Sequence, residues 1–148
     1  MIHVDLCEMD IRSLRGAKYF LLFKDDLSHY HTVHFLKTKY ETAEKLEIFM
    51  KIIKNQFDKT LKCLGSDHST EIKNADTQRL LNELGVFHSR SNIYTAQPNR
   101  RIEREIRTIV ESTRSAIHAN DFNENVWAEA VNYAVFTSNQ TGTSSLKD

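Results

Sequence analysis

The fold of this chain is decided by two segments: LGSDHSTEI (residues 64–72) and LGVFHSRSNIYTAQPNRRIEREIR (residues 84–107). The first segment includes the end of an apolar run that predicts a short strand over 61–65, and Asp67 lies just beyond that strand. In the second, a glycine is placed to end a helix over 73–84, and a further short strand is expected at 86–88. A polar loop over 89–99 then precedes a helix over 100–118, where isoleucines recur at helical spacing. This alternation of strands and helices indicates an α/β domain.

Outward from these segments, the sequence predicts three opening strands, then a helix that precedes the strand over 61–65, and finally a closing helix. The opening strands are expected over 2–6, 18–23 and 30–36, and the short connection between the last two is typical of a hairpin. A capping-box pattern at 38–41 introduces an amphipathic helix over 41–57. The closing helix is expected over 123–139, with Trp127 on its buried side. The expected fold class is therefore α/β, with helices packed on a mixed sheet of five strands.

The composition fits one globular domain. The chain has 148 residues, of which 40% are hydrophobic and 27% charged, so it is long enough to bury a core without covalent staples. No apolar run approaches about 18 residues, so no membrane partner is expected. The N-terminus lacks the pattern of a secretory signal. Cys7 and Cys63 form no CxxC motif, and we expect both to be buried apolar residues in a protein of a reducing compartment.

The distribution of charge is more informative than its sum. The formal net charge is zero, so bulk electrostatics do not indicate a nucleic-acid partner. Residues 90–114, however, hold six arginines against three glutamates, whereas Asp121, Glu124 and Glu129 make the following segment acidic. On the helix over 100–118, Glu103, Arg107 and Arg114 fall on one face beside the apolar stripe. This face is a candidate surface for phosphate contacts.

Three carboxylates are candidates for a metal site. Asp5 lies in the first strand, Asp67 follows the fourth, and Glu103 lies on the helix after the loop, with 35 residues between the last two. Hard oxygen ligands suit Mg²⁺ or Mn²⁺, and two such ions about 4 Å apart activate the attacking oxygen and neutralise charge in phosphodiester chemistry. An acidic residue inside an apolar strand also needs a partner. Against this, twenty acidic residues make chance triples common, and surface carboxylates are the default interpretation.

Several other features have a structural and a functional interpretation. His29, His31 and His34 are close in sequence, but we expect them at alternating exposed strand positions rather than around a metal ion. His68 lies beside Asp67 and is a candidate metal ligand or a drifted loop residue. Trp127 belongs to a helical apolar stripe, which favours the core over a base-stacking role.

With these residues in view, the chain resembles the integrase catalytic core of Ty1/copia-type retrotransposons, within the RNase H-like superfamily of retroviral integrases and transposases. The resemblance covers nearly the whole chain and is carried by IHVDLC (2–7), residues 18–39, LGSDHSTEI (64–72), YTAQPNRRIEREIRTIVESTRS (94–115) and VWAEAVNYAVFTSNQ (126–140). The family pattern around the third acidic residue is similar to YTPQQNGxAERxNRTIxExxR. The matching residues are Tyr94, Thr95, Gln97, Asn99, Glu103, Arg104, Arg107, Thr108, Ile109, Glu111 and Arg114.

The resemblance implies a fold, a site and partners. The fold is RNase H-like, with a mixed five-stranded sheet and helices on both faces. The site is a D,D(35)E set of Asp5, Asp67 and Glu103 that binds two Mg²⁺ or Mn²⁺ ions. The residues expected to contact DNA are Gln97, Asn99, Arg100, Arg104, Arg107 and Arg114. The implied reaction is DNA 3′-end processing and strand transfer into target DNA by a homodimer, with no small-molecule substrate. The implied location is the nucleus, or cytoplasmic virus-like particles.

The departures from the family pattern define an alternative. His68, Ser69 and Thr70 replace the usual Asn-Gly-Gly after the second aspartate, Arg100 stands where a glycine is usual, and Gly65 where an arginine is usual. From the resemblance, we also expect this sequence to hold the core alone, without the zinc-binding region and the C-terminal DNA-binding part that flank the core in the family. The alternative is therefore a catalytically impaired, decayed or host-domesticated core that binds nucleic acid or protein. A nuclease of RNase H type is a third interpretation, which the match over 94–114 disfavours.

Overall fold

The computed structural model describes residues 1–67, 72–90 and 97–141, with the side chains of 97–99 left out of the description. Five strands form one mixed sheet in the order β3-β2-β1-β4-β5. The strands are β1 (Ile2–Glu8), β2 (Tyr19–Asp25), β3 (His31–Leu36), β4 (Cys63–Ser66) and β5 (Phe87–Arg90). The first three are antiparallel neighbours, whereas β4 is parallel to both β1 and β5. The predicted element order and the mixed five-stranded sheet are confirmed.

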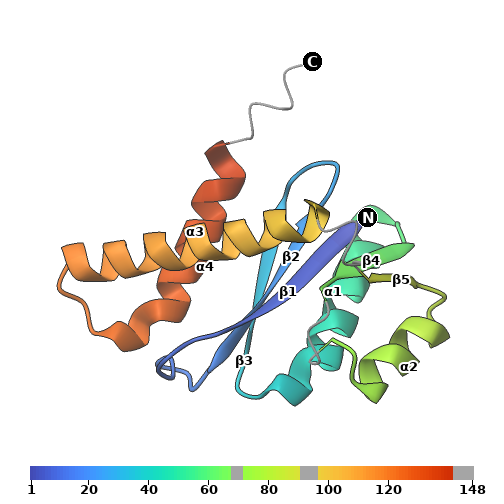
Figure 1. Ribbon diagram of the computed structural model, residues 1–148, viewed down its shortest axis with the longest axis horizontal. Helices are drawn as coiled ribbons and strands as arrows, with labels where there is room; N and C mark the ends of the chain where they lie inside the picture. The colour runs from blue at the N-terminus through green and yellow to red at the C-terminus, as the bar shows by residue number, and fades with distance from the viewer. Residues whose placement is uncertain (68–71, 91–96, 142–148) are drawn as a thin grey trace.

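Four α-helices cover the two faces of the sheet (Figure 1). They are α1 (Thr42–Phe57), α2 (Ala75–Glu83), α3 (Gln97–Ala119) and α4 (Trp127–Thr141), with single 3₁₀ turns at Lys39–Glu41 and Glu124–Val126. Leu46 and Phe49 of α1 and Leu81 of α2 pack with Val4 and Leu64 on one face. The helices α3 and α4 cover the opposite face. The buried residues from α3 and α4 on that face are Ile102, Ile106, Ile109, Ile117, Trp127, Ala128, Val131 and Val135.

The ends of several elements differ from the sequence prediction for local reasons. The second helix begins at Ala75 rather than residue 73, because the Asn74 side chain accepts a hydrogen bond from the Thr77 N–H at 2.7 Å and caps the helix. Leu84, the last residue of the predicted helix, is 52% exposed because it lies just past the last turn. The loop expected over 89–99 is shorter, since β5 continues to Arg90 and α3 already begins at Gln97. Its central residues, 91–96, lie outside the described part of the chain.

Two expectations about burial have different outcomes. Trp127 is 2% exposed and its Nε1 donates a hydrogen bond to the Ile11 carbonyl at 2.9 Å, so its predicted core position is confirmed. Cys7 and Cys63 are only half-buried, and both are free thiols. Among the helices within residues 1–67, 72–90 and 97–141, none has both the length and the apolar character needed to cross a membrane.

Candidate active site

The register of the two central strands sets Asp67 beside Asp5. In the parallel β1–β4 pair, His3 is opposite Gly65 and Val4 is opposite Ser66. Continuing this register by one residue brings Asp67, which directly follows β4, next to Asp5. Side chains alternate along a strand, so Asp5 points to the same face as His3, the face covered by α3 and α4. The sequence places these two carboxylates 62 positions apart, and the parallel crossover brings them together.

The His3 side chain lies against Gly65 of the adjacent strand, on the same face of the sheet as Asp5. A Cβ atom added to Gly65 would lie 2.7 Å from His3 Nδ1, so the pair is a fitted contact between adjacent strands. His3 is 4% exposed, and its Nε2 lies 3.4 Å from the Asp26 carboxylate. Burial lowers the pKa of His3, although the Asp26 carboxylate acts in the opposite direction. The arginine that the family pattern has at position 65 would therefore conflict with His3.

A chain of hydrogen bonds supports the strand that ends at Asp67. Ser66 is 1% exposed, and its Oγ lies 2.6 Å from His88 Nε2 on β5. His88 Nδ1 in turn lies 3.0 Å from Gln78 Nε2 on α2, and the Gln78 Oε1 accepts a hydrogen bond from Arg90 at 3.1 Å. Burial, and then the charge of Arg90, lowers the pKa of His88. These bonds connect β4, β5 and α2 immediately before the position of Asp67.

The third acidic residue, Glu103, lies on the exposed surface of α3 beside the apolar stripe. The stripe predicted from the isoleucine spacing is confirmed: Ile102 is 3% exposed and Ile106 is 9% exposed. Glu105 lies on the flank of this stripe that meets β2 and β3, as shown by its contacts to Lys24 and His31. Glu103 is two residues earlier, about 200° around the helix from Glu105, and so lies on the opposite flank. That flank is therefore the one turned away from the Glu105 contacts with β2 and β3.

The donor chemistry of these residues fits a hard divalent cation, but only two of the three are adjacent. Aspartate oxygens are the ligands that Mg²⁺ and Mn²⁺ prefer, and Asp5 is already oriented by a 2.9 Å hydrogen bond from the Leu6 N–H to its Oδ1. Within the described residues, no three His, Cys, Asp or Glu side chains form a group that could hold a metal ion. His68, the other ligand considered from the sequence, lies outside the described residues. The Asp5–Asp67 pair is therefore the core of the candidate site.

Sequence reasoning missed a buried charge cluster on the same face. Lys24 of β2 is 7% exposed and forms an ion pair with Glu105 of α3. His31 of β3 lies 2.8 Å from the same carboxylate and is 7% exposed, so the expectation of an exposed histidine was wrong. The signal in the sequence was the alternation of β2, which puts Lys24 on the face of Phe20 and Leu22, where a cation needs a partner.

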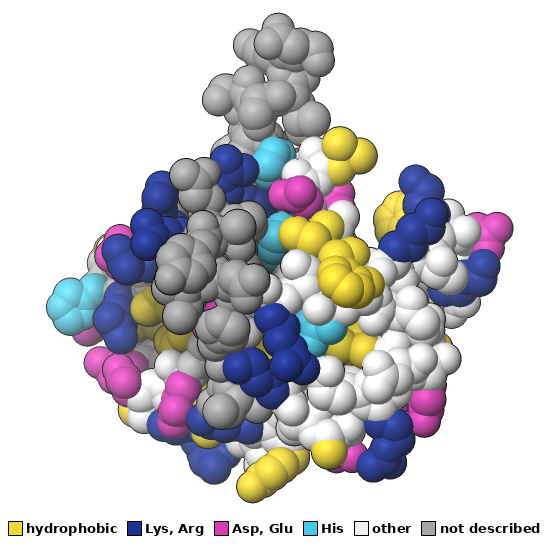
Figure 2. Space-filling view, turned by 45° about the vertical axis from the view of Figure 1, so that its right-hand side comes forward, with side chains coloured by type: hydrophobic (Ala, Val, Ile, Leu, Met, Phe, Trp, Pro, Cys, Tyr) yellow, Lys and Arg dark blue, Asp and Glu magenta, His cyan; other side chains and the backbone are white. Residues whose placement is uncertain are grey.

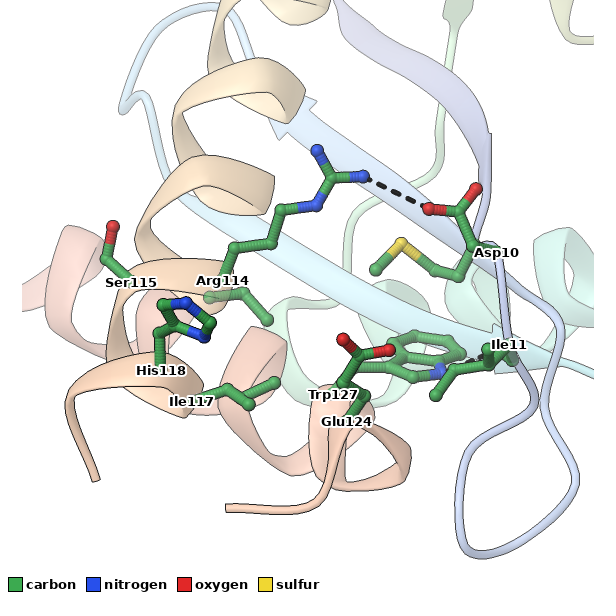
Figure 3. A pocket seen from close by; sticks show the side chains of 10 residues that line it. Asp10, Ile11, Arg114, Ser115, Ile117, His118, Glu124 and Trp127 are labelled. Carbon is green, nitrogen blue, oxygen red and sulfur yellow. Dashed lines mark hydrogen bonds and ion pairs between the residues drawn. The ribbon is translucent and has the colours of Figure 1, made fainter. Parts of the chain in front are cut away.

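The residues expected to contact DNA are distributed along α3. Arg100, Arg104 and Arg107 are exposed near its beginning, whereas the side chains of Gln97 and Asn99 lie outside the description. Arg114 is eleven residues beyond Glu103, about 16 Å along the helix. Figure 3 shows Arg114 at a pocket lined also by His118, Glu124 and Trp127, where its guanidinium lies 3.3 Å from the Asp10 carboxylate. The arginines therefore form a row along α3 rather than one compact group.

The surface charge is mixed, in keeping with the net charge of zero. On the face in Figure 2, Lys and Arg side chains lie in several separate groups, with Asp and Glu side chains between them. Such a surface lacks the continuous positive field of a strongly basic nucleic-acid-binding protein. Contacts with DNA would therefore depend on individual placed arginines rather than on bulk charge.

Comparison with known proteins agrees with the resemblance. No family model matches the chain. Over 142 residues, or 95% of its length, the chain is 32% identical to the retrovirus-related Pol polyprotein from transposon TNT 1-94 of Nicotiana tabacum, and it spans 11% of that polyprotein. A chain in a cryo-EM structure of the simian T-cell lymphotropic virus intasome with PP2A regulatory subunit B56 gamma aligns with a TM-score of 0.69. That alignment covers 92% of this chain and 46% of the other at 13% identity, and it confirms the predicted α/β RNase H-like fold.

Proposed function

Because this chain is an integrase-like relative of the Pol polyproteins of retrotransposons, we propose that it is the catalytic core of a retrotransposon integrase. In this proposal it is a metal-dependent polynucleotidyl transferase that processes the 3′ ends of element DNA and joins them to target DNA. The observation that supports the proposal is the β1–β4 register, which when continued by one residue sets Asp67 beside Asp5 on the face that α3 covers. Two adjacent carboxylates at the end of parallel strands are a favourable position for a ligand in an open α/β sheet.

The proposal gives each acidic residue a role in holding two Mg²⁺ or Mn²⁺ ions. Asp5 and Asp67 would be the principal ligands, and Glu103 would supply the third carboxylate from α3. When bound, the ions lower the pKa of the attacking oxygen and neutralise the charge that develops on the phosphate. Arg100, Arg104 and Arg107 are exposed on α3 and are proposed to hold DNA phosphates, together with Gln97 and Asn99.

The proposed reaction has two displacements at phosphorus. In the first, a water oxygen bonds to phosphorus near the element end and the 3′-oxygen leaves as a hydroxyl. In the second, that 3′-hydroxyl attacks a phosphodiester of the target strand, whose own 3′-oxygen leaves. The partners in this proposal are element DNA, target DNA and a second copy of the chain, and the reaction on chromosomal DNA takes place in the nucleus.

One observation favours the second candidate function, a nucleic-acid-binding or protein-binding core without efficient catalysis. Within residues 1–67, 72–90 and 97–141, three metal-ligating side chains do not come together, and Glu103 is exposed. A core whose third ligand stays apart would bind metal weakly. The two functions therefore differ in whether divalent cations bind to this chain and whether DNA cleavage follows.

The test is a titration of the purified chain with Mn²⁺ and with Mg²⁺, reading thermal stability and nicking of a branched DNA substrate together. If the proposal holds, Mn²⁺ raises the melting temperature and DNA is cut, and Asp67→Asn abolishes both responses. Asp76→Asn is the matched control, because Asp76 is an exposed aspartate on α2 that contacts Arg79 and lies away from the pair. A well-folded wild type with no metal response would contradict catalysis and favour the binding function.

The third ligand is tested separately with Glu103→Gln. Both Glu103 and Glu111 are exposed on α3, so neither substitution should lower the free energy of unfolding by more than about 0.5 kcal/mol. We expect Glu103→Gln to lower the nicking rate by at least about 100-fold, in the range of a lost charge-stabilising group. Glu111→Gln should leave the rate unchanged, and equal rates for the two variants would exclude Glu103 from the site.

A further inference from the structure

A single carboxylate on α3 connects this helix to two strands of the sheet. Glu105 is half-buried and forms an ion pair with Lys24 of β2, and its second oxygen lies 2.8 Å from His31 Nε2 of β3. Lys24 and His31 are directly opposite each other in the β2–β3 register. Burial alone raises the pKa of Glu105, but the hydrogen bonds from His31 and Lys24 outweigh it, and the pKa is lowered. Glu105 is therefore a charged anchor point between α3 and the sheet.

The partners of Glu105 are themselves held in place. The backbone N–H of His31 donates to the Asn139 Oδ1 of α4 at 2.8 Å, and the Asn139 Nδ2 donates to the His31 carbonyl at 2.8 Å. Lys24 is buried near the end of β2, where an unpaired ammonium group would be costly. Because neither partner is free to follow Glu105, movement of Glu105 would break the cluster.

The apolar packing under α3 does not fix the rotation of the helix about its own axis. The contacts of Glu105 with Lys24 and His31 can fix it. Ile102, Ile106 and Ile109 hold the helix on the sheet, but burial of apolar area is non-directional and tolerates small rotations about the helix axis. A rotation of about 30° moves a Cα atom by roughly 1 Å, and a side-chain tip by more. Buried polar groups can define one arrangement among several of similar apolar packing.

We propose that Glu105 is a positioning residue: its bonds to Lys24 and His31 fix the rotation of α3 on the sheet and thereby set the position of Glu103, two residues earlier on the same helix. The inference rests on the proposed function, in which Glu103 completes the metal site. Glu103 and Glu105 are separated by two residues and lie on opposite flanks of the apolar stripe. A rotation of α3 that moved Glu103 would also pull Glu105 out of its contact with Lys24. The position of Glu103 is therefore coupled to the ion pair between Lys24 and Glu105.

The experiment compares Glu105→Gln with the double variant Lys24→Met/Glu105→Met, and uses Glu111→Gln as the control. Two readouts are taken: the Mn²⁺ concentration that gives half of the maximal thermal stabilisation, and amide hydrogen exchange along α3. We expect Glu105→Gln to raise that Mn²⁺ concentration about tenfold and to lower kcat on branched DNA with little change in KM. Amide exchange should accelerate over residues 100–109 and stay unchanged over 113–119.

The double variant separates positioning from stability. Two methionines replace the buried ion pair with apolar volume, so the melting temperature without metal should return to that of the wild type. The weakened Mn²⁺ response should persist, because the directional contact is gone. Wild-type Mn²⁺ response in the double variant, or wild-type exchange over 100–109 in Glu105→Gln, would overturn the inference. A wild type that does not respond to Mn²⁺ contradicts the proposed function instead, and the exchange readout still decides whether Glu105 holds α3.

Discussion

The two faces of the sheet differ in what their side chains do. On the face covered by α1 and α2, strands β1, β2 and β4 contribute mainly apolar groups such as Val4, Leu21 and Phe23. On the face covered by α3 and α4, one row across the sheet is polar, with His3 and Lys24 directly opposite each other. Asp5 lies two residues further along β1 on that same face. The comparison teaches that both faces carry an apolar core, but that buried charged groups are concentrated at one end of the face covered by α3 and α4, called here the polar face in contrast to the apolar face under α1 and α2.

The polar face is stable because the groups in its row have partners from outside the sheet. His3 is paired with Asp26, and Lys24 is paired with Glu105. Each of these contacts joins segments that are far apart or on different elements, so the cost of burial is offset only in the folded state. The stability of the apolar face, in contrast, depends on how well the volumes and shapes of its side chains fit together. Substitutions on the two faces should therefore fail in different ways.

The largest effect is expected on the apolar face. The Phe23 ring stacks on Phe49 at 4.0 Å between centroids with 7° between the planes, and Phe23 is 1% exposed. Phe23→Ala should lower the free energy of unfolding by about 3–5 kcal/mol because it leaves a cavity under α1. Any Mn²⁺-induced rise in melting temperature should remain, because the opposite face is intact. Urea denaturation with and without Mn²⁺ measures both quantities.

Phe57→Ala is the control for this substitution, because Phe57 ends α1 and is 65% exposed. We expect it to change stability by no more than about 0.5 kcal/mol. If Phe23→Ala folds but loses its response to Mn²⁺ while Phe57→Ala keeps it, the two faces are not independent and the comparison fails.

Most of the fold was available from the sequence because its signals are local. Periodicity gave the order of the elements, and the isoleucine stripe of α3 was correct at each position from Ile102 to Ile117. Element ends were less accurate, because they depend on individual hydrogen bonds such as the Asn74 cap. The pairing of β1 with β4 was not predicted, since no local pattern encodes which distant strand lies alongside.

A second, smaller effect is expected where the polar face has no spare volume. In Gly65→Ala the added Cβ would lie 2.7 Å from His3 Nδ1, and His3 is too buried to move freely. We expect a loss of about 1–2 kcal/mol in the free energy of unfolding, as for other overpacked sites. In a His3→Ala background the same substitution should cost much less. Chemical denaturation of the four proteins in this double-mutant cycle measures the coupling.

Additive losses in that cycle would contradict the fitted contact between His3 and Gly65. The contact would also explain one departure from the family pattern, since a side chain at position 65 requires a smaller residue at position 3. Coupling between the two positions would show that the departure is a matched pair rather than a single lost residue.

The candidate site was only partly predictable, for a physical reason. Asp5 and Asp67 were found because carboxylates in and after apolar strands stand out locally. Glu105 was not singled out, because on the helix it is one acid among several, and its importance comes from Lys24 and His31, which are 81 and 74 residues away in sequence. The burial of His31 followed from the same contact. Partnerships of this kind are set by tertiary packing, which periodicity does not report.

The smallest effect concerns the histidine on the apolar face, His34. Its ring lies edge-on to Phe23 at 5.7 Å, and its buried Nε2 has no hydrogen-bond partner among the residues that the structure describes. Burial, and then the charge of Lys45, lowers the pKa of His34 below its ordinary 6.5. The unfolded chain therefore binds a proton at a higher pH than the folded chain does. The stability that His34 contributes is complete above about pH 6.5 and is lost as the pH falls from there through the folded pKa.

We accordingly expect the free energy of unfolding to be lower at pH 5.5 than at pH 7.5, and His34→Leu to make that fall shallower. Some fall should remain, because burial also lowers the pKa of His3 and His88. His118→Gln is the control, since His118 is exposed on α3 and the substitution should leave the fall unchanged. Urea denaturation at the two pH values measures the difference. A fall as steep in His34→Leu as in the wild type would mean that the apolar face does not penalise a charge at this position, and that its contrast with the polar face is weaker than the packing indicates.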